Sequence, residues 1–342
     1  MGNDVSKIKH RMSGRSIRAW NPIPAVTRTW TSSMEVRASN APTTAMEDIP
    51  DFRWMEGRKY HAVKGSSYFL PRDNQEVDRL VMQHYMVKAI FEGNTLEQVT
   101  PLLEKKDATV LDVGYSKSQI ALDSEKQILP PSRSQDVASE YSHAECHAID
   151  MCAVFPESVK PTNVTFTKCN VLEGLPFPDK SFDVVHMRSL IFGLRAGEWP
   201  SVLAEIFRVV KPGGMVQLVE SEIAYITPDP GCYTHMEKLC SILSSLGQDP
   251  FIALHLEALV PAAGFEFILH EKRSIAVGWK GKLSEIWFDD AMAIGQATKG
   301  FFAPALGMNG VEYDIYIKDL INKLRTSRSY TNWHAVVGRR PI

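Results

Sequence analysis

The sequence lacks the features of membrane-spanning, secreted and nucleic-acid-binding proteins. No run of eighteen apolar residues occurs in the 342-residue chain, which argues against a helix that spans a membrane. The N-terminus is polar and basic and has no apolar segment, so it is not a secretory signal. The formal net charge of −2 lacks the basic excess of a general nucleic-acid binder. We therefore expect a globular protein without a nucleic-acid partner.

Cysteine is scarce and is not arranged for metal binding. The five cysteines are odd in number and form no C-x-x-C pair. This pattern is typical of reduced thiols in an intracellular protein, and we predict a cytoplasmic location. Because metal-ligand spacing is absent, we predict no metal site.

Composition divides the chain into a tail and one folded domain. Residues 1–50 are rich in Ser, Thr, Asn, Arg and Pro, which predicts a disordered basic tail. We expect a single domain over 51–342. It begins with a helical cap (51–107), continues through an alternating core (108–222) and ends with further helices and final strands (223–342).

The cap contains a predicted helix. Val77, Leu80 and Phe91 belong to an apolar series that repeats near helical spacing. Asp73 or Asn74 is placed to cap its N-terminus, and Gly93-Asn94 is placed to end it.

From about residue 108, short apolar runs alternate with helical patterns. Such alternation predicts a parallel sheet covered by helices on both faces. The expected strands are Thr109–Val113, Glu145–Ile149, Val164–Thr167, Phe182–His186 and Met215–Glu220, followed by 265–270 and 333–339. The expected helices are Trp199–Val210, 233–247, 251–262 and 283–297. Gly213-Gly214, in a Lys-Pro-Gly-Gly turn, suits the exit of the first helix because that turn needs a positive φ.

Residues suited to a nucleotide-like cofactor follow the first three strands. Asp112 and Gly114 end the first strand, where backbone N–H groups would meet the cofactor. Asp150 ends the second strand, and a carboxylate there accepts both hydroxyls of a ribose. Asn170 and Val171 follow the third strand, where an amide would bond the edge of an adenine and an apolar side chain would cover its face.

The fourth strand is followed by His186, Met187 and Arg188. Because parallel strands end at one edge of the sheet, these residues are expected near the cofactor and near the substrate.

These motifs, in this order, resemble the class I S-adenosylmethionine-dependent methyltransferases. They are D-x-G at 112–114, I-D at 149–150, LPFPDKSFDVVH at 175–186 and RVVKPGG at 208–214. The flanking stretches YFLPRDNQEVDRLVMQHY, IAVGWKGKLSEIW and NWHAVVGRRP resemble a large fungal family that includes the LaeA-like regulators of secondary metabolism.

The resemblance covers roughly 51–342 and implies a Rossmann-like α/β fold. Its seven-stranded sheet is mostly parallel, with helices on both faces and the last strand antiparallel. It also implies S-adenosylmethionine as cofactor, bound by the core 108–222, with the substrate on the side of 223–342. The methyl acceptor is unknown, and a small molecule is favoured over a protein.

The chain departs from the family at residues 115–135. The family continues with G-x-G-x-G, whereas this chain reads YSKSQIALDSEKQILPPSRSQ, which contains no glycine. Tyr115 and Lys117 would put side chains where the methionine part of the cofactor lies, because only glycine allows so close an approach. We interpret the segment as a mis-spliced or unspliced gene prediction. Sequencing the transcript across codons 114–136 tests this, and a clean transcript encoding the peptide would refute it.

Methyl transfer is an in-line displacement and needs a base only when the nucleophile arrives protonated. His186 and His235 are the candidate bases; the competing interpretation makes the first a core-edge residue and the second a helix-surface residue. Four aromatic residues are candidates either for a substrate pocket or for the core: Tyr60, Trp199, Tyr233 and Trp287.

Two other functions compete with methyl transfer. A catalytically impaired, methyltransferase-shaped interaction module is favoured by the altered segment after Gly114. A nicotinamide-dependent oxidoreductase is disfavoured because G-x-G-x-x-G is absent. Calorimetry with S-adenosylmethionine distinguishes the interaction module from an active methyltransferase, because the module is expected not to bind this cofactor.

The tail begins M-G-N-D-V-S, which matches the pattern for N-myristoylation at Gly2. Basic residues follow, and a basic cluster supplies the second signal that one acyl chain needs for membrane binding. The competing interpretation is a chance match. Peripheral membrane contact through Gly2 is therefore one expectation for location, and the nucleus is an alternative left open.

Overall fold

A computed structural model describes residues 52–62, 66–114, 133–151 and 161–342. Its strands are β1 (Phe52–Met55), β2 (Arg58–His61), β3 (Thr109–Val113), β4 (Glu145–Asp150), β5 (Val164–Lys168), β6 (Phe182–Arg188), β7 (Val210–Ser221), β8 (Glu266–Ala276) and β9 (Tyr330–Arg339). Its helices are α2 (Asn74–Ile90), α3 (Thr100–Leu103), α4 (Arg133–Glu140), α5 (Trp199–Val209), α6 (Pro230–Ser245), α7 (Ile252–Ala262), α8 (Gly281–Ala297), α9 (Lys299–Ala305) and α10 (Gly310–Thr326), with a 3₁₀ helix, η1 (Val171–Glu173).

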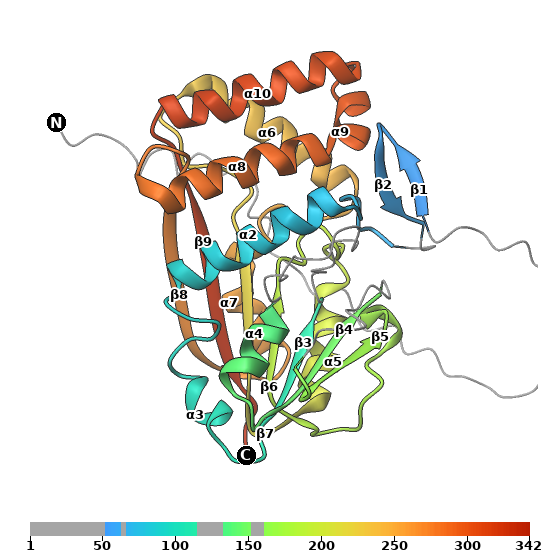
Figure 1. Cartoon of the computed structure of the whole chain (residues 1–342), viewed down its shortest axis with the longest axis vertical. Coiled ribbons are helices and arrows are strands. Elements are labelled where there is room, and N and C mark those ends of the chain that lie inside the picture. The colour runs from blue at the N-terminus through green and yellow to red at the C-terminus, as the bar shows by residue number, and fades with distance from the viewer. Residues whose placement is uncertain (1–51, 63–65, 115–132, 152–160) are drawn as a thin grey trace, which may run out of the picture. The chain divides into compact units, whose positions relative to one another are not determined.

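A seven-stranded sheet organises the chain, in the order β5-β4-β3-β6-β7-β9-β8 (Figure 1). β9 runs antiparallel to both of its neighbours, while β3 to β7 pair in parallel. The predicted α/β class, the seven strands and the antiparallel last strand are therefore confirmed. The strand order reverses beside β3, and ligands bind at such a switch point in open α/β sheets.

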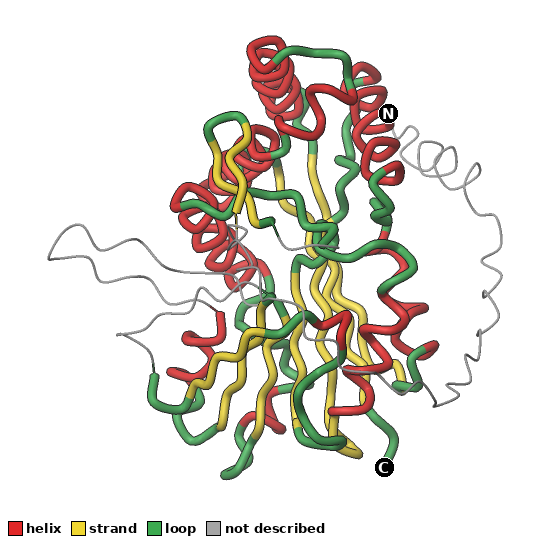
Figure 2. The backbone as a smooth tube through the Cα atoms, turned by 90° about the vertical axis from the view of Figure 1, so that its right-hand side faces the viewer, coloured by secondary structure: helices red, strands yellow, loops and turns green. Residues whose placement is uncertain are grey.

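Helices pack on both faces of the sheet (Figures 1 and 2). On one face, α5 and α7 cover a core to which α5 contributes Val202, Leu203 and Ile206. On the other face the core includes Val110, Val184 and residues of α2 and α4. Helices α6, α8, α9 and α10 form a further layer beyond one end of the strands (Figure 1). The side chains of consecutive strand residues thus bury on opposite faces, as a doubly covered sheet requires.

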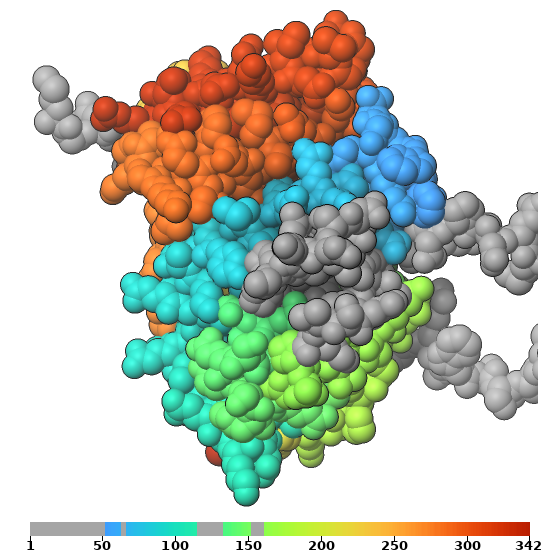
Figure 3. Space-filling model, in the orientation of Figure 1, coloured from blue at the N-terminus to red at the C-terminus, as the bar shows by residue number. Residues whose placement is uncertain are grey.

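Helix α2 begins as predicted at Asp73, whose carboxylate accepts a hydrogen bond from the backbone N–H of Glu76 at 3.1 Å. The same carboxylate pairs with Arg58 of the β1–β2 hairpin at 2.5 Å. In the space-filling view the hairpin (blue) lies beside α2 (cyan) and the C-terminal helices (orange to red) on one face of the molecule (Figure 3). The ion pair thus fastens the β1–β2 hairpin to the start of α2.

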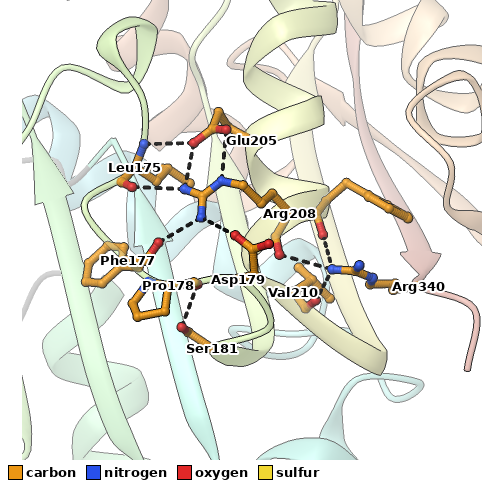
Figure 4. A network of polar contacts seen from close by, with 10 residues as sticks. Leu175, Phe177, Pro178, Asp179, Ser181, Glu205, Arg208, Val210 and Arg340 are labelled. Carbon is orange, nitrogen blue, oxygen red and sulfur yellow. Dashed lines mark hydrogen bonds and ion pairs between the residues drawn. The ribbon is translucent and has the colours of Figure 1, made fainter.

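The LPFPD stretch is held by Arg208 of α5 (Figure 4). Its guanidinium donates to the carbonyl oxygens of Leu175 (3.0 Å) and Phe177 (2.8 Å) and pairs with Glu205 at 2.8 Å. Arg340 donates to three carbonyl oxygens around the C-terminus of α5, those of Phe207, Arg208 and Val210. Since a cation at a helix C-terminus is favourable, these two arginines stabilise the connection from α5 to the sheet.

Three details differ from the sequence prediction. The Lys-Pro-Gly-Gly segment lies within β7 rather than in a turn, although Gly213 has the expected positive φ of 76°. The hairpin β1–β2 was not predicted, and neither were the helices α3, α4, α9, α10 and η1. The remaining strand and helix predictions agree with the structure to within a few residues, except that β8 continues to Ala276.

Residues 49–342 form one compact unit. The internal division of this unit at 107 and 222 stays a prediction, and the tail 1–50 lies outside the described residues. Within the described ranges Cys146, Cys169, Cys232 and Cys240 are free thiols. Among the same residues, every helix is too short or too polar to cross a membrane.

Candidate functional site

A pocket lies where the carboxyl ends of β3, β4, β5 and β6 meet the cap, with a volume of about 190 Å³. The strand-end side of the wall contains Gly114, Asp150, Met151, Asn170, Val171 and Arg188. The cap side contains His61, Ser66, Tyr68, Arg72, Asp73 and Glu76. Pockets at this edge of an open sheet are the usual ligand sites of α/β proteins.

Five of the predicted cofactor residues lie in the wall of this pocket: Gly114, Asp150, Asn170, Val171 and Arg188. Gly114 has φ +77°, and a Cβ atom there would come within 2.7 Å of the Leu190 side chain. Asp150 is half-buried at the end of β4. The structure therefore brings these residues together at one edge of the sheet, as the alternation of strands and helices predicted.

Asn170 has a local function that the sequence analysis did not foresee. Its side-chain oxygen accepts a hydrogen bond from the N–H of Leu172 at 3.2 Å, and its amide donates to Glu173 at 3.1 Å. Asn170 is thus the N-cap of η1. Its predicted bond to the edge of an adenine stays a prediction, since the amide is already engaged.

Asp112 does not lie in the wall of the pocket. It is 4% exposed and forms an ion pair with Arg133 and a hydrogen bond with Ser134, both at the start of α4. A buried carboxylate needs such partners. The prediction that Asp112 contacts the cofactor is therefore not supported by its position.

His186 and Met187 are also buried behind the pocket rather than in it. Met187 belongs to the core under α5, and His186 is 4% exposed on the opposite face. Burial, followed by the charges of Arg133 and Arg188, holds the pKa of His186 well below its usual range, so the imidazole is neutral. His186 is therefore better interpreted as a residue at the edge of the core than as a catalytic base.

His235 lies on α6, where its ring packs edge-on against Tyr316 of α10 with centroids 5.0 Å apart. The wall of the pocket does not include it. The four aromatic candidates are likewise absent from this wall: Tyr60, Trp199, Tyr233 and Trp287. Tyr60, Trp199 and Trp287 are buried in the core.

The cap side of the pocket was missed by the sequence analysis. The Nε2 atom of His61 lies 3.0 Å from the carbonyl oxygen of Tyr68, and burial lowers the pKa of His61. Asp73 is paired with Arg58, and both oxygens of Glu76 accept hydrogen bonds from Arg79. The nearby carboxylates of the cap are therefore neutralised by arginines.

Arg79 lies at the centre of a buried polar cluster between α2 and α8. Its guanidinium is 2.6 Å from Glu76 and 2.9 Å from Asp290, and Gln83 donates to Asp290 at 3.0 Å. All four side chains are buried. This cluster fixes α2, and with it Glu76 in the wall of the pocket, against α8.

A second chain of polar contacts joins α4 to the end of β6 through α2. Asp136 contacts Lys88 at 2.6 Å and the Nε2 atom of His84 at 3.4 Å. On the other side of the ring, Nδ1 of His84 lies 3.4 Å from the guanidinium of Arg188. Burial lowers the pKa of His84 to about 4, so the ring is neutral near pH 7 and Nδ1 accepts from Arg188.

Replacing Gly114 by alanine should lower the free energy of unfolding by about 1–2 kcal/mol, because a Cβ atom is strained at positive φ. Urea denaturation measures the change. Gly197→Ala is the matched control, since nothing lies within 4 Å of a Cβ there and its φ is not positive. A Gly114→Ala protein as stable as the wild type would contradict the strain described here.

Strand order, the glycine at the end of β3 and the pocket at the switch point together define a Rossmann-like α/β protein built to hold a nucleotide-like ligand. Residues 110–214 match the family described as methyltransferase domain. The chain therefore carries a methyltransferase domain. This match and the relatives support S-adenosylmethionine-dependent methyl transfer, and the chain resembles a group of fungal methyltransferases that includes LaeA-like regulators.

Three relatives illustrate this similarity. N-methyltransferase verN of Clonostachys rogersoniana is 26% identical over 56% of this chain and 68% of that protein. Methyltransferase str2 of Strobilurus tenacellus is 29% identical over 59% of this chain and 68% of that protein. The secondary metabolism regulator LAE1 of Cochliobolus heterostrophus is 25% identical over 49% of this chain and 50% of that protein.

Proposed function

We propose that the chain transfers a methyl group to a small-molecule acceptor that enters the pocket beside the cap. The observation that carries the proposal is the composition of the wall, in which strand-end residues such as Gly114 and Asp150 face cap residues such as His61 and Tyr68. A concave site of about 190 Å³ suits part of a small ligand better than the extended surface of a protein.

The residues at the strand ends fit S-adenosylmethionine, which supplies an electrophilic methyl group when bound. Gly114 offers backbone without a side chain at the end of β3, and Asp150 offers a carboxylate for hydroxyl groups at the end of β4. Val171 offers an apolar surface for a ring. The residues of this chain therefore bind and orient the two reactants, which is most of what an in-line displacement needs.

His61 is the candidate base when the acceptor arrives protonated. It lies in the wall of the pocket, and its lowered pKa keeps the imidazole neutral near pH 7. A neutral imidazole is the form that accepts a proton. His61 replaces His186 and His235 in this role, since neither of those lies in the wall.

Calorimetry with S-adenosylhomocysteine tests the proposal first. The wild type should bind, and Asp150→Asn should bind about ten- to a hundredfold more weakly, since hydrogen bonds to a charged group are lost. Asp249→Asn, outside this pocket, is the matched control and should bind like the wild type.

Incubation with methyl-tritiated S-adenosylmethionine and a fungal extract should then label the small-molecule fraction; label only in protein would contradict the choice of acceptor.

The impaired interaction module remains the second candidate function. It is favoured by the engagement of Asp112 with Arg133 and Ser134, and by the lack of glycine in 115–135, most of which lies outside the described residues. This function predicts no heat of binding with S-adenosylhomocysteine in the wild type.

We also propose that the protein is cytoplasmic and contacts membranes through a myristoylated Gly2, a residue outside the described ranges. Gly2→Ala should move the protein from the membrane fraction to the soluble fraction, because the lipid cannot be attached. Asn3→Ala keeps the glycine and is the control. Unchanged fractionation of the Gly2→Ala protein would rule the lipid out.

A further inference from the structure

Arg188, which is partly buried, differs from the buried arginines Arg79 and Arg133 in having no carboxylate partner among the described residues. Arg79 and Arg133 each form ion pairs with buried acids. Among the described residues, the guanidinium of Arg188 has in contrast only the ring nitrogen of His84 as a polar contact, at 3.4 Å, and no carboxylate lies within 4.0 Å of it. Burial lowers the pKa of Arg188 to about 10, which still leaves it charged at neutral pH.

Two acids act on Arg188, Glu220 through its charge and Asp136 through the ring of His84, and both are committed elsewhere. Glu220 is the carboxylate whose charge acts on Arg188, but its two oxygens accept the backbone N–H groups of Leu190 (2.7 Å) and Ile191 (3.3 Å). Asp136 reaches Arg188 only through the ring of His84. A second guanidinium, that of Arg133, is close enough for the two positive charges to repel. The positive charge of Arg188 is therefore under-compensated inside the protein.

Arg188 and its neighbour Ser189 both lie in the wall of the pocket. Ser189 has a positive φ of 58°, a conformation that strains a serine. Its hydroxyl oxygen is buried and has no hydrogen-bond partner among the described residues. The wall thus offers a guanidinium whose acceptor is a neutral ring nitrogen and, next to it in the chain, a hydroxyl without a partner among the described residues.

A partly buried cation without a counter-ion in the wall of a pocket favours a ligand that supplies the opposite charge. A carboxylate suits a guanidinium because two parallel N–H···O bonds match its two oxygens. The wall also contains apolar side chains, among them Val77, Leu80 and Leu194. We propose that Arg188, oriented by His84 and joined by Ser189, binds the carboxylate of a ligand with an apolar body in this pocket.

The carboxylate belongs either to the amino-acid part of the cofactor or to the methyl acceptor. The inference rests on the proposed function, because that function puts both molecules in this pocket. Calorimetry with two probes separates these sources. S-adenosylhomocysteine carries the carboxylate, whereas 5′-methylthioadenosine has the same thioether nucleoside without it. If the cofactor is the source, Arg188→Gln should weaken S-adenosylhomocysteine by about ten- to a hundredfold and leave 5′-methylthioadenosine unchanged.

If the acceptor is the source, both nucleosides bind Arg188→Gln as they bind the wild type. Benzoate, but not benzamide, should then bind the wild type saturated with S-adenosylhomocysteine and not bind Arg188→Gln. Arg325→Gln, which removes a positive charge outside this pocket, is the control for a general loss of positive charge. Arg188→Lys keeps the charge and should recover part of the affinity, which distinguishes recognition from misfolding.

His84→Phe tests the orienting role. It should weaken the carboxylate-bearing probe while leaving 5′-methylthioadenosine unchanged, a split that a purely structural defect would not produce. The inference is overturned if Arg188→Gln binds both nucleosides and benzoate as the wild type does. If the wild type binds neither nucleoside, the proposed function is refuted instead. Whether Arg188 binds a carboxylate is then tested on the unliganded protein, by comparing the binding of benzoate with that of benzamide.

Discussion

Replacing Arg79 by methionine should lower the free energy of unfolding by about 3–5 kcal/mol. The guanidinium is buried and bonds two buried carboxylates, those of Glu76 and Asp290. Without it, both acids are left inside the protein without a counter-charge. Because burial already raises the pKa of each, they would take up protons, and the loss of stability should be smaller at pH 5 than at pH 8.

Urea denaturation of the wild type and the Arg79→Met protein measures this effect. Arg325→Met is the matched control: Arg325 is also paired with a glutamate, Glu285, but both side chains are more than 40% exposed, so the cost should stay below about 1 kcal/mol. Adding Glu76→Gln and Asp290→Asn to Arg79→Met should restore part of the stability. A loss equal to that of the Arg325 control would contradict the buried cluster as a stabilising contact between α2 and α8.

Acid should destabilise the protein through His84, by about 2 kcal/mol between pH 8 and pH 5. The folded-state pKa of about 4 lies below the usual value of 6.5, because burial outweighs the nearby Asp136. The unfolded chain therefore binds more protons than the folded chain in this window. The contribution of His84 is fully present above about pH 6.5 and is lost as the pH falls toward 4. His186, whose pKa is also lowered, acts in the same direction.

The test compares slopes of stability against pH rather than absolute values, since the substitution itself changes stability. His84→Gln should flatten the slope between pH 5 and pH 8 by about 2 kcal/mol over the window. His235→Gln is the control on a partly exposed histidine of α6 and should change the slope much less. A His84→Gln protein with the slope of the wild type would show that this ring is not the titrating group.

The sheet could be predicted because each of its strands is a short apolar run that can be recognised in the local sequence. β3 was predicted with its observed bounds, and parallel pairing then aligned Gly114, Asp150 and Arg188 at one edge without further information. The helix α10 was missed although a readable signal exists: Asn309 and Glu312 form a capping box at its start. The hairpin β1–β2 has four-residue strands without clear alternation, so periodicity could not reveal it.

The cap side of the pocket could not be predicted in the same way. His61 and Glu76 reach the pocket because the cap packs over the strand ends, and that placement depends on contacts such as Arg79 with Asp290, 211 residues apart. Asp112 was placed at the right end of the right strand, yet Arg133 occupies its carboxylate. The sequence pattern therefore predicted the correct edge of the sheet, but it did not predict which side chains at that edge face the ligand.

The position of β9 has a consequence for how the protein is made. β9 lies between β7 and β8, and it is the only described strand that pairs with β8. While the ribosome is adding residues 277–329, both β7 and β8 present open hydrogen-bonding edges, which are prone to pair with other chains. These two edges are paired only when Tyr330–Arg339 emerges and fills the gap between β7 and β8.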